Sequence, residues 1–357
     1  MNEEPKLEPQ PPEILTREVE GIGGKVGPQP ADFVVDEIPR YSLSGEGEHR
    51  YVRLRKQRLT TPDLVRAVAR AAGVPEREIG CAGMKDKHAV TSQWLSLPAR
   101  SVPPDEWALP AEVELLEVSR HERKLRTGQL AGNRFGIRLV DVPSGSLQRG
   151  ELICQLLQER GLPNYFGFQR FGSHGDNLDR ALRWLRQGSP RGKRARFYRK
   201  LYPSVIQSEV FNRTLTLRLQ RGLDSLVAGD VVRLEGSHAV FVVEDPAREA
   251  ARLESGDIHL TGPMIGPKMK SPTGEALALE QAAVDDLGLT SEDLAVLGRM
   301  VDGTRRDLFV SPDPLSLQPL ENDSLLLDFT LPAGSYATQL VRELTRAEWR
   351  AEDRTSD

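Results

Sequence analysis

The spacing of hydrophobic residues in the first part of the chain predicts two strands followed by one well-delimited helix. The run DFVVDEI at 32–38 is short, apolar and rich in β-branched residues, and YVRLRK at 51–56 alternates apolar with basic residues, so both predict strands. The stretch 61–73 repeats apolar residues at helical spacing, with Thr61 as the predicted N-cap and Gly73 at the stop.

Strands and helices continue to alternate along the chain without forming regular strand–helix–strand units. This arrangement predicts an α+β fold with mixed or antiparallel sheets. The predicted strands are AVTSQWLSL, VELLEVS and GNRFGIRLVDV; the predicted helices are ELICQLLQERG, ended by Gly161, and the amphipathic SEVFNRTLTLRLQRG; LLLDFTLPAGSYATQLVRELT predicts a strand, a tight turn and a helix.

Composition divides the chain into segments. A strongly basic run at 191–200 opens a stretch of β-like pieces and loops, and the earlier pattern returns near Pro312. The first residues are acidic and proline-rich, which is typical of a flexible tail. We therefore predict a tail at 1–15, one discontinuous domain at 16–187 and 311–347, and an inserted domain at 188–310.

The bulk composition limits where the protein works. A chain of 357 residues with 38% hydrophobic content is long enough for two ordinary domains. It has no long apolar run, and its N-terminus lacks the basic and apolar segments of a signal peptide, so we expect no membrane span. Cys81 and Cys154 are the two cysteines and have no metal-ligand spacing, which fits a reducing cytoplasm.

The charge pattern bears on nucleic acid binding. The formal net charge of −4 argues against a protein that coats nucleic acid nonspecifically. Basic residues nevertheless gather in three clusters, which we expect to meet phosphate groups: 50–56, 120–126 and 191–200.

The sequence GCAGMKDKHAVTSQW at 80–94 concentrates charge beside two glycines. Lys85, Asp86, Lys87 and His88 are consecutive there. One interpretation is an exposed charged turn. The other is an active site, because nearby cations keep Asp86 ionised at neutral pH and an ionised carboxylate acts as a nucleophile or a base.

Familiar catalytic motifs are missing from the sequence. It contains no GxSxG, P-loop, HExxH or paired CxxC motif, and its six histidines show no ligand spacing. Chemistry would then depend on side chains, and we predict neither a metal nor a cofactor. The aromatic stretch PNYFGFQRFG at 163–172 and the basic clusters indicate a nucleic acid partner, because bases stack on aromatic rings and phosphates pair with Arg and Lys.

Five ordered motifs resemble those of the TruD family of tRNA pseudouridine synthases. They are DFVVDEI with GEGEH, GMKDKHAVTSQW, KLRTGQLAGNRF, PNYFGFQRFG and LPAGSYAT, and the resemblance extends from about Gly24 to Leu344. It implies a pseudouridine-synthase fold with a mixed or antiparallel central sheet. The catalytic domain would be the discontinuous one, and 188–310 would be the TruD-specific insertion.

The resemblance also implies an activity. Such enzymes isomerise a uridine of transfer RNA to pseudouridine, at position 13 in the D arm in the bacterial members, without metal or cofactor. We accordingly expect a tRNA-binding, cytoplasmic monomer. Asp86 would be the catalytic nucleophile, Asn164 and Phe166 would bind the base, and Phe33 and Tyr336 would contact the target nucleotide.

The same residues have simpler interpretations when the resemblance is set aside. Phe33 on a β-branched strand is typical of a core residue, Asn164 is typical of a turn, and Tyr336 is typical of packing at a helix start. The family usually has a basic residue where this chain has Gly27. The basic partner of Asp86 is then either Lys25 or Lys85.

Two other classes of function remain open at this point. A noncatalytic RNA-binding protein on the same scaffold would keep the basic and aromatic residues without needing Asp86. A hydrolase with a carboxylate nucleophile would need a metal cluster or a second acid, and the sequence indicates neither. Product mass separates them, because isomerisation leaves the mass of the RNA unchanged and hydrolysis does not.

Overall fold

The computed structural model of the chain describes residues 8–172, 174–188, 195–222 and 225–347. These residues form two compact units. The sheet unit contains the described residues of Val19–Gln158, Pro312–Ala337 and Leu344–Asp357. The helical unit contains those of Met1–Glu18, Glu159–Ser311 and Thr338–Glu343.

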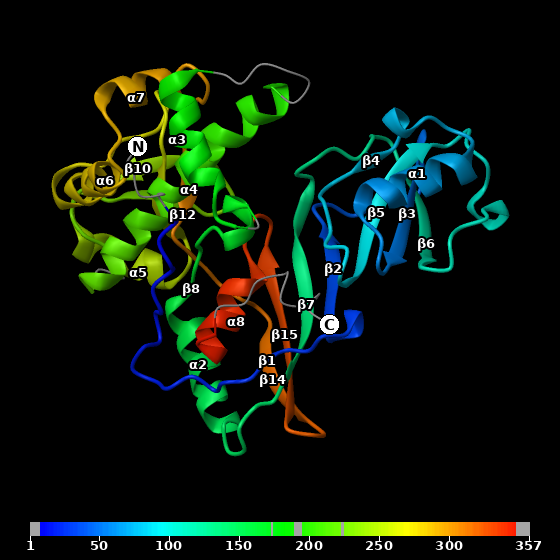
Figure 1. Ribbon diagram of the computed structural model, residues 1–357, viewed down its shortest axis with the longest axis horizontal. Helices are drawn as coiled ribbons and strands as arrows, with labels where there is room; N and C mark the ends of the chain where they lie inside the picture. The colour runs from blue at the N-terminus through cyan, green and yellow to red at the C-terminus, as the bar shows by residue number, and fades with distance from the viewer. Residues whose placement is uncertain (1–7, 173, 189–194, 223–224, 348–357) are drawn as a thin grey trace, which may run out of the picture. The chain divides into compact units, whose positions relative to one another are not determined.

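Within the described residues, nine strands of the sheet unit form one sheet (Figure 1). The order is β14-β15-β7-β2-β5-β3-β6, with β1 beside β7 and β4 beside β5, and only β2 and β5 pair in parallel among these strands. The predicted α+β fold with a mixed sheet is confirmed. The strands are β1 Lys25–Val26, β2 Phe33–Pro39, β3 His49–Lys56, β4 Gly80–Cys81, β5 Val90–Pro98, β6 Val113–His121, β7 Leu130–Val140, β14 Leu315–Leu320 and β15 Ser324–Pro332.

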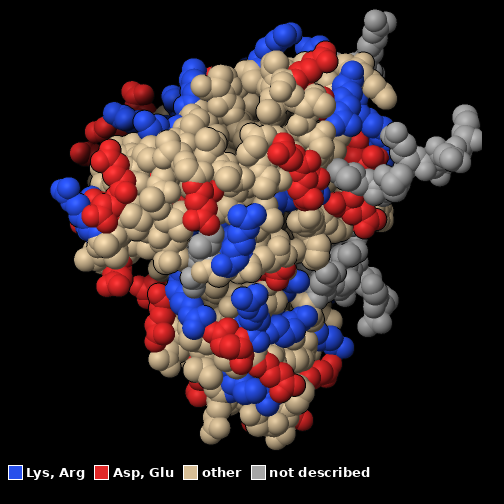
Figure 2. All heavy atoms as spheres, turned by 90° about the vertical axis from the view of Figure 1, so that its left-hand side faces the viewer, with Lys and Arg blue, Asp and Glu red and all other residues tan. Residues whose placement is uncertain are grey.

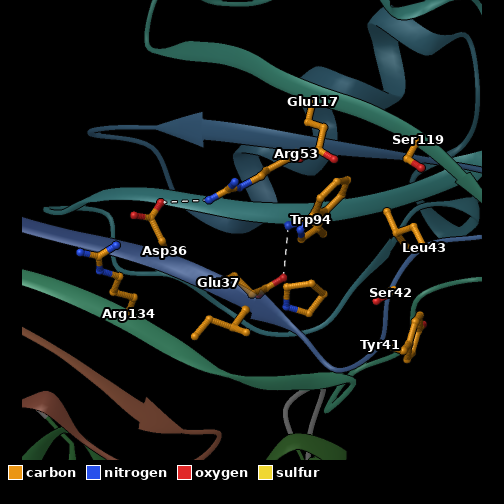
Figure 3. Close-up of a pocket in the computed structure, with 12 residues that line it drawn as sticks. Asp36, Glu37, Tyr41, Ser42, Leu43, Arg53, Trp94, Glu117, Ser119 and Arg134 are labelled. Carbon is orange, nitrogen blue, oxygen red and sulfur yellow. Dashed lines mark hydrogen bonds and ion pairs between the residues drawn. The ribbon is translucent and has the colours of Figure 1, made fainter. Parts of the chain in front are cut away.

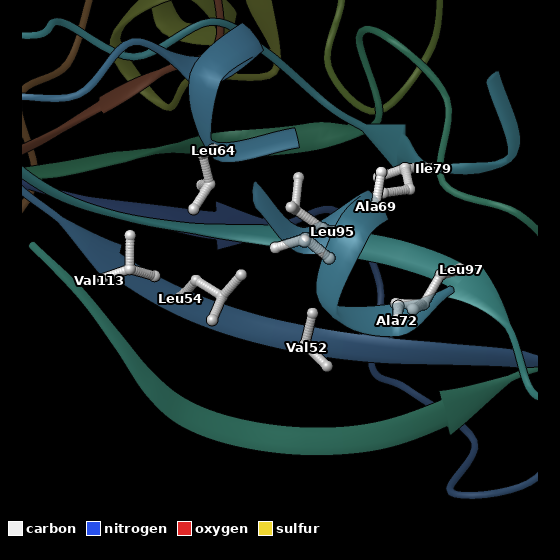
Figure 4. Close-up of a cluster of buried hydrophobic side chains, with 10 residues drawn as sticks. Val52, Leu54, Leu64, Ala69, Ala72, Ile79, Leu95, Leu97 and Val113 are labelled. Carbon is white, nitrogen blue, oxygen red and sulfur yellow. The ribbon is translucent and has the colours of Figure 1, made fainter. Parts of the chain in front are cut away.

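Helix α1 (Thr61–Ala72) packs on one face of β3 and β5 (Figure 4). Its side chains Leu64 and Val68 are fully buried against Val52, Leu54 and Leu95 of the two strands. Burying a side chain of this size stabilises a fold by about 1.5–3 kcal/mol. The apolar stripe read from the sequence therefore fixes which face of the sheet the helix covers.

The start of α1 differs from the prediction by one residue. Thr60, not Thr61, is the N-cap: its hydroxyl accepts from the backbone N–H of Asp63, and the Asp63 carboxylate accepts from the backbone N–H of Thr60. This reciprocal pair is a capping box, which satisfies two N–H groups at the helix end. Thr61 becomes the first helical residue, so its hydroxyl is available to other partners. Gly73 ends the helix as predicted, with φ 66°.

Helix α2 (Leu147–Arg160) follows β7 and ends before Gly161, which has φ +81°, as predicted. Gly150 allows a close approach to the sheet, because a Cβ at that position would lie 2.4 Å from Cδ2 of Leu317 on β14. The helix therefore lies directly on the half of the sheet that the C-terminal strands supply.

Helix α4 (Ala195–Gln220) lies at the centre of the helical unit, where α3, α6 and β11 contact it. The predicted helix is confirmed, but its predicted amphipathic character is wrong, because every side chain from Val205 to Thr216 is buried. Buried ion pairs neutralise its charges, including Arg213 with Glu209 at 2.8 Å. The other elements are α3 Asn177–Gln187, α5 Pro246–Glu254, α6 Gly274–Asp286, α7 Ser291–Leu297, α8 Ala337–Thr345, the sheet β10-β9-β11-β12 (Val240–Val242, Val231–Leu234, Ile258–Met264, Thr304–Asp307), and the pair β8 Leu162–Pro163 with β13 Phe309–Val310.

The two compact units match the segments predicted from composition only in part. Residues 1–7 of the predicted tail lie outside the described residues, whereas Glu13 and Leu15 donate backbone hydrogen bonds to Tyr165 and Glu343 of the helical unit. The sheet unit joins both parts of the predicted discontinuous domain. The long middle segment of the helical unit extends from Glu159 to Ser311. The domain boundaries at 187/188 and 310/311 stay predictions.

The surface in Figure 2 carries Lys and Arg interspersed with Asp and Glu, rather than a field of one sign. Part of the basic run at 191–200, residues 191–194, lies outside the described residues. No helix in the described ranges has the length and apolar character that a membrane span requires.

Candidate active site

The loop between β4 and β5 carries Asp86, and three hydrogen bonds hold its backbone and carboxylate. The backbone N–H of Lys85 donates to Oγ1 of Thr61 at 2.9 Å, and the ammonium of Lys56 donates to the backbone carbonyl of Asp86 at 2.7 Å. The Asp86 carboxylate accepts from the backbone N–H of His88 at 2.9 Å. The loop is therefore attached to α1 and β3, and a carboxylate on it has a defined position.

Lys85 turns its side chain into the protein. Its ammonium lies 2.9 Å from Oε2 of Glu37 on β2, with the two side chains only 5% and 1% exposed, and it donates to Oδ1 of Asn133 at 2.7 Å. Glu37 and Asn133 are directly opposite each other on β2 and β7, so the sheet sets this position. Along the loop, Met84 is exposed and Asp86 is partly exposed, whereas the side chain of Lys85 is buried.

Lys56 is a buried cation beside Asp86. Its side chain is 1% exposed, and burial lowers its pKa to about 8, with Lys85 acting in the same direction and Asp86 opposing it. The sequence grouped Lys56 with Arg50 in a phosphate-binding cluster. That expectation is corrected for both residues, because Arg50 is also buried and donates to the carbonyls of Ala99 and Val102.

The two predicted charge partners of Asp86 have other partners. Lys25 forms an exposed ion pair with Asp141 at 2.9 Å, because β1 pairs with the end of β7. Lys85 pairs with Glu37 instead of its chain neighbour. At Gly27, where the family usually has a basic residue, a Cβ would lie 2.3 Å from Oδ2 of Asp32. A side chain there therefore requires the Asp32 carboxylate to move.

The aromatic residues predicted for the sheet unit differ in exposure. Phe33 is 5% exposed and its ring meets Phe135 edge-on at 6.3 Å, and Phe135 stacks on Phe329 at 5.0 Å. Side chains alternate between the two faces of a strand, so Phe33 lies on the same face of β2 as Val35 and Glu37, and Asp36 lies on the other face. Tyr336 is partly buried in the turn between β15 and α8.

Asn164 and Phe166 belong to the helical unit, where the segment PNYFG is held on both sides. The backbone N–H of Asn164 donates to the carbonyl of Leu308 at 2.8 Å. The side chain of Asn212 on α4 bonds both the N–H and the carbonyl of Phe166, at 2.9 and 3.0 Å. Both predicted base-binding residues therefore have fixed backbones, with 5% and 7% exposure.

The sheet unit also contains a pocket of about 520 Å³ that Glu37 of β2 helps to line (Figure 3). Asp36, Arg53 and Trp94 line it, and none of its lining residues is a predicted site residue. Arg53 lies 3.5 Å from Asp36, and Arg134 pairs with Asp328, so these charges already have partners. The pocket therefore offers a weaker candidate site than the Asp86 loop.

Comparison with known proteins decides the family. The family model described as "tRNA pseudouridine synthase D (TruD)" matches residues 12–185 and 195–344. This chain belongs to the TruD family. It is 44% identical over 340 residues to a tRNA pseudouridine synthase D of Anaeromyxobacter sp. (strain Fw109-5), covering 94% of this chain and 96% of that one.

Further comparisons extend the TruD assignment to other organisms and to the fold. A tRNA pseudouridine synthase D of Thermus thermophilus is 40% identical over 343 residues, covering 94% of this chain and 92% of the relative. A solved TruD structure from Methanosarcina mazei superposes with a TM-score of 0.73 at 23% identity, covering 92% of this chain and 95% of that one. The predicted fold class is thereby confirmed.

The sequence missed several residues that support the TruD motifs. Thr61 was assigned to a helix cap, Lys56 to phosphate binding, and Arg306 to no role, yet Arg306 contacts both Asn164 and Phe166. Their partners are distant in sequence, so spacing alone gives no signal for these contacts. Among the described residues, no group of three or more His, Cys, Asp or Glu side chains could hold a metal ion.

Proposed function

We propose that this chain isomerises a uridine of transfer RNA to pseudouridine, with position 13 of the D arm as the target. Membership of the TruD family supports the reaction. The observation that carries the proposal is the Asp86 loop, which is attached to Thr61 and Lys56 and in which Asp86 is partly exposed. An ordinary surface turn would not need two such buried attachments.

Asp86 acts as the nucleophile in this proposal. The ionised carboxylate attacks C1′ of the sugar, and the N-glycosidic bond breaks with its electron pair leaving on the uracil. The uracil turns, and its C5 bonds to C1′ and displaces the carboxylate. C5 then loses its proton and N1 takes up one, so the product is an isomer of the substrate. The reaction changes no oxidation state and consumes no second substrate, so the proposal includes no cofactor and no metal.

The other predicted residues bind the displaced nucleotide. Removing a uridine from its stack costs a few kcal/mol, and least where the RNA is already distorted. Asn164 would bond the base, Phe166 would line its pocket, and Phe33 and Tyr336 would contact the nucleotide. Each stacking contact contributes about 1–3 kcal/mol. Neither Lys25 nor Lys85 is assigned as a direct partner of Asp86, because Asp141 and Glu37 hold their ammonium groups.

We further propose that the protein acts as a monomer in the cytoplasm, where unmodified transfer RNA is available. Its two cysteines are free thiols, which supports a reducing compartment.

The experiment compares the wild-type protein with Asp86→Asn on unmodified transfer RNA. Pseudouridine is mapped by carbodiimide adducts and primer extension. The proposal expects one new stop in the D arm with the wild type and none with Asp86→Asn. Asp141→Asn is the matched control, because Asp141 is 69% exposed in the same unit and should leave the stop unchanged.

Two outcomes would overturn the proposal in different ways. Wild-type protein that binds transfer RNA tightly but produces no stop would be a noncatalytic RNA-binding protein. A stop that persists with Asp86→Asn would establish the reaction and remove Asp86 from it.

A further inference from the structure

The side-chain amide of Asn164 is held by two partners on β12. Its Oδ1 accepts from Nη2 of Arg306 at 2.6 Å, and its Nδ2 donates to the backbone carbonyl of Asp307 at 2.9 Å. Arg306 also donates to the backbone carbonyl of Asn164 at 3.1 Å. A guanidinium only donates and a carbonyl only accepts, so the two partners together fix which end of the amide is oxygen and which is nitrogen.

The same guanidinium covers Phe166. Its central carbon lies 4.2 Å from the centroid of the Phe166 ring and 5.3 Å from that of Phe211. A cation over an aromatic face contributes about 0.5–2 kcal/mol, most when it is desolvated. One side chain therefore contacts both residues that the proposed function assigns to the base.

Arg306 is itself held by the strand around it. It pairs with Gly262 of β11, where a Cβ would lie 3.0 Å from the Phe211 ring, so the strands and α4 pack closely. Its neighbours are anchored as well: Arg305 pairs with buried Glu280 at 2.6 Å, and Asp307 pairs with Arg233 at 2.8 Å. The backbone of Arg306 is thus held in place on both sides.

The orientation of this amide decides which pyrimidine it can recognise. The bonds to Arg306 and Asp307 use one N–H and one lone pair of Asn164, and an amide has two of each. The remaining N–H and lone pair match a uracil, which offers a carbonyl acceptor and the N3–H donor. A flipped amide would instead match cytosine, whose N3 accepts and whose N4 amino group donates.

We propose that Arg306 is a positioning residue that fixes the Asn164 amide in the orientation that selects uridine over cytidine. The inference rests on the proposed function, because it needs Asn164 to bond the target base. Arg306 acts through Asn164 and does not touch the reacting atoms. Its loss should therefore reduce base discrimination more than overall RNA binding.

The test measures dissociation constants for transfer RNAs that carry uridine, cytidine or 3-methyluridine at the target position. Each is measured in the Asp86→Asn background, which prevents turnover. With Arg306 present, both altered RNAs should bind more weakly than the uridine RNA. For each altered RNA we take the ratio of its dissociation constant to that of the uridine RNA. Arg306→Met should reduce each ratio about tenfold, the effect of losing one charge-assisted hydrogen bond. Arg306→Lys should restore part of the discrimination, because lysine still donates to Oδ1.

A double-mutant comparison separates positioning from general destabilisation. In an Asn164→Ala background, Arg306→Met should change the ratios less than about twofold, since Arg306 then has no amide to orient. Arg252→Met is the matched control, because Arg252 also lies over a ring, 5.6 Å from the centroid of Phe241, and contacts neither base residue. Circular dichroism confirms folding, and Arg306→Lys carries the test if Arg306→Met does not fold.

The outcomes are distinguishable from those of the proposed function. Wild-type protein that makes no pseudouridine removes the proposed function whatever Arg306 does. Active wild type with equal binding of the three RNAs, or with ratios unchanged by both Arg306 variants, overturns the inference alone. The inference is also overturned if Arg306→Met reduces the binding ratios as much in the Asn164→Ala background as it does when Asn164 is present.

Discussion

The buried ion pair of Lys85 and Glu37 should dominate the stability of the Asp86 loop. We consider Lys85→Met, which leaves the Glu37 carboxylate buried, and Glu37→Gln, which leaves the Lys85 ammonium buried. The two charges are 2.9 Å apart with 5% and 1% of their side chains exposed. At an effective dielectric constant of about 20, their attraction is roughly 6 kcal/mol, much of which offsets the cost of removing both charges from water.

Each single substitution should lower the free energy of unfolding by about 3–5 kcal/mol, because an uncompensated charge then remains inside. The double variant Glu37→Gln with Lys85→Met should lose much less than the sum of the two single losses, since it leaves no lone charge. Unfolding in urea, followed by fluorescence and circular dichroism, measures all three. The matched control is Lys25→Met, whose ion pair with Asp141 is 67% and 69% exposed and should be worth about 0–1 kcal/mol.

The reasoning would be refuted by single variants that lose no more than Lys25→Met. It would also be refuted by strictly additive losses in the double variant, because additivity would mean that the two charges do not depend on each other. Either result would assign the rigidity of the loop to Thr61 and Lys56 alone.

Two further predictions concern those attachments. The pKa of Lys56 is about 8, below its usual 10.5, so between these values the unfolded chain binds the extra proton and stability rises with pH. The stability of the wild type relative to Lys56→Met should therefore increase by about 1.5 kcal/mol from pH 8 to pH 9.5, and parallel urea curves at the two pH values would contradict this. Thr61→Val should lower the free energy of unfolding by about 1–3 kcal/mol, because the N–H of Lys85 and Oε1 of Gln93 lose their partner. It should also lower kcat more than it raises KM. Thr60→Ala should lower the free energy of unfolding by about 1 kcal/mol, because the helix cap is lost, and should leave kcat unchanged. If the two substitutions change kcat equally in the pseudouridine assay, this difference between Thr60 and Thr61 is refuted.

Local patterns in the sequence were sufficient for the elements that position the site. The apolar stripe of α1, the β-branched run of β2 and the strand–turn–helix around Tyr336 each depend on neighbours within a few residues. The capping box was misplaced by one residue, because Thr60 and Thr61 are equally good caps and only the bond to Asp63 separates them. Helix α4 was predicted to be amphipathic, whereas its charged residues Arg213 and Glu209 are buried as an ion pair.

The motifs of the sequence by themselves determined the family, the mixed α+β fold and the position of Asp86 in a charged loop. Only the tertiary structure decided which charges meet. Lys85 and Glu37, Lys56 and the Asp86 carbonyl, and Arg306 and Asn164 are brought together by strand pairing between distant segments. The physical reason is that hydrophobic periodicity records which face of an element is buried, but not which polar group of another element lies opposite it. The sequence does not distinguish a buried lysine such as Lys56 from an exposed one such as Lys25, because their burial depends on how the sheet assembles.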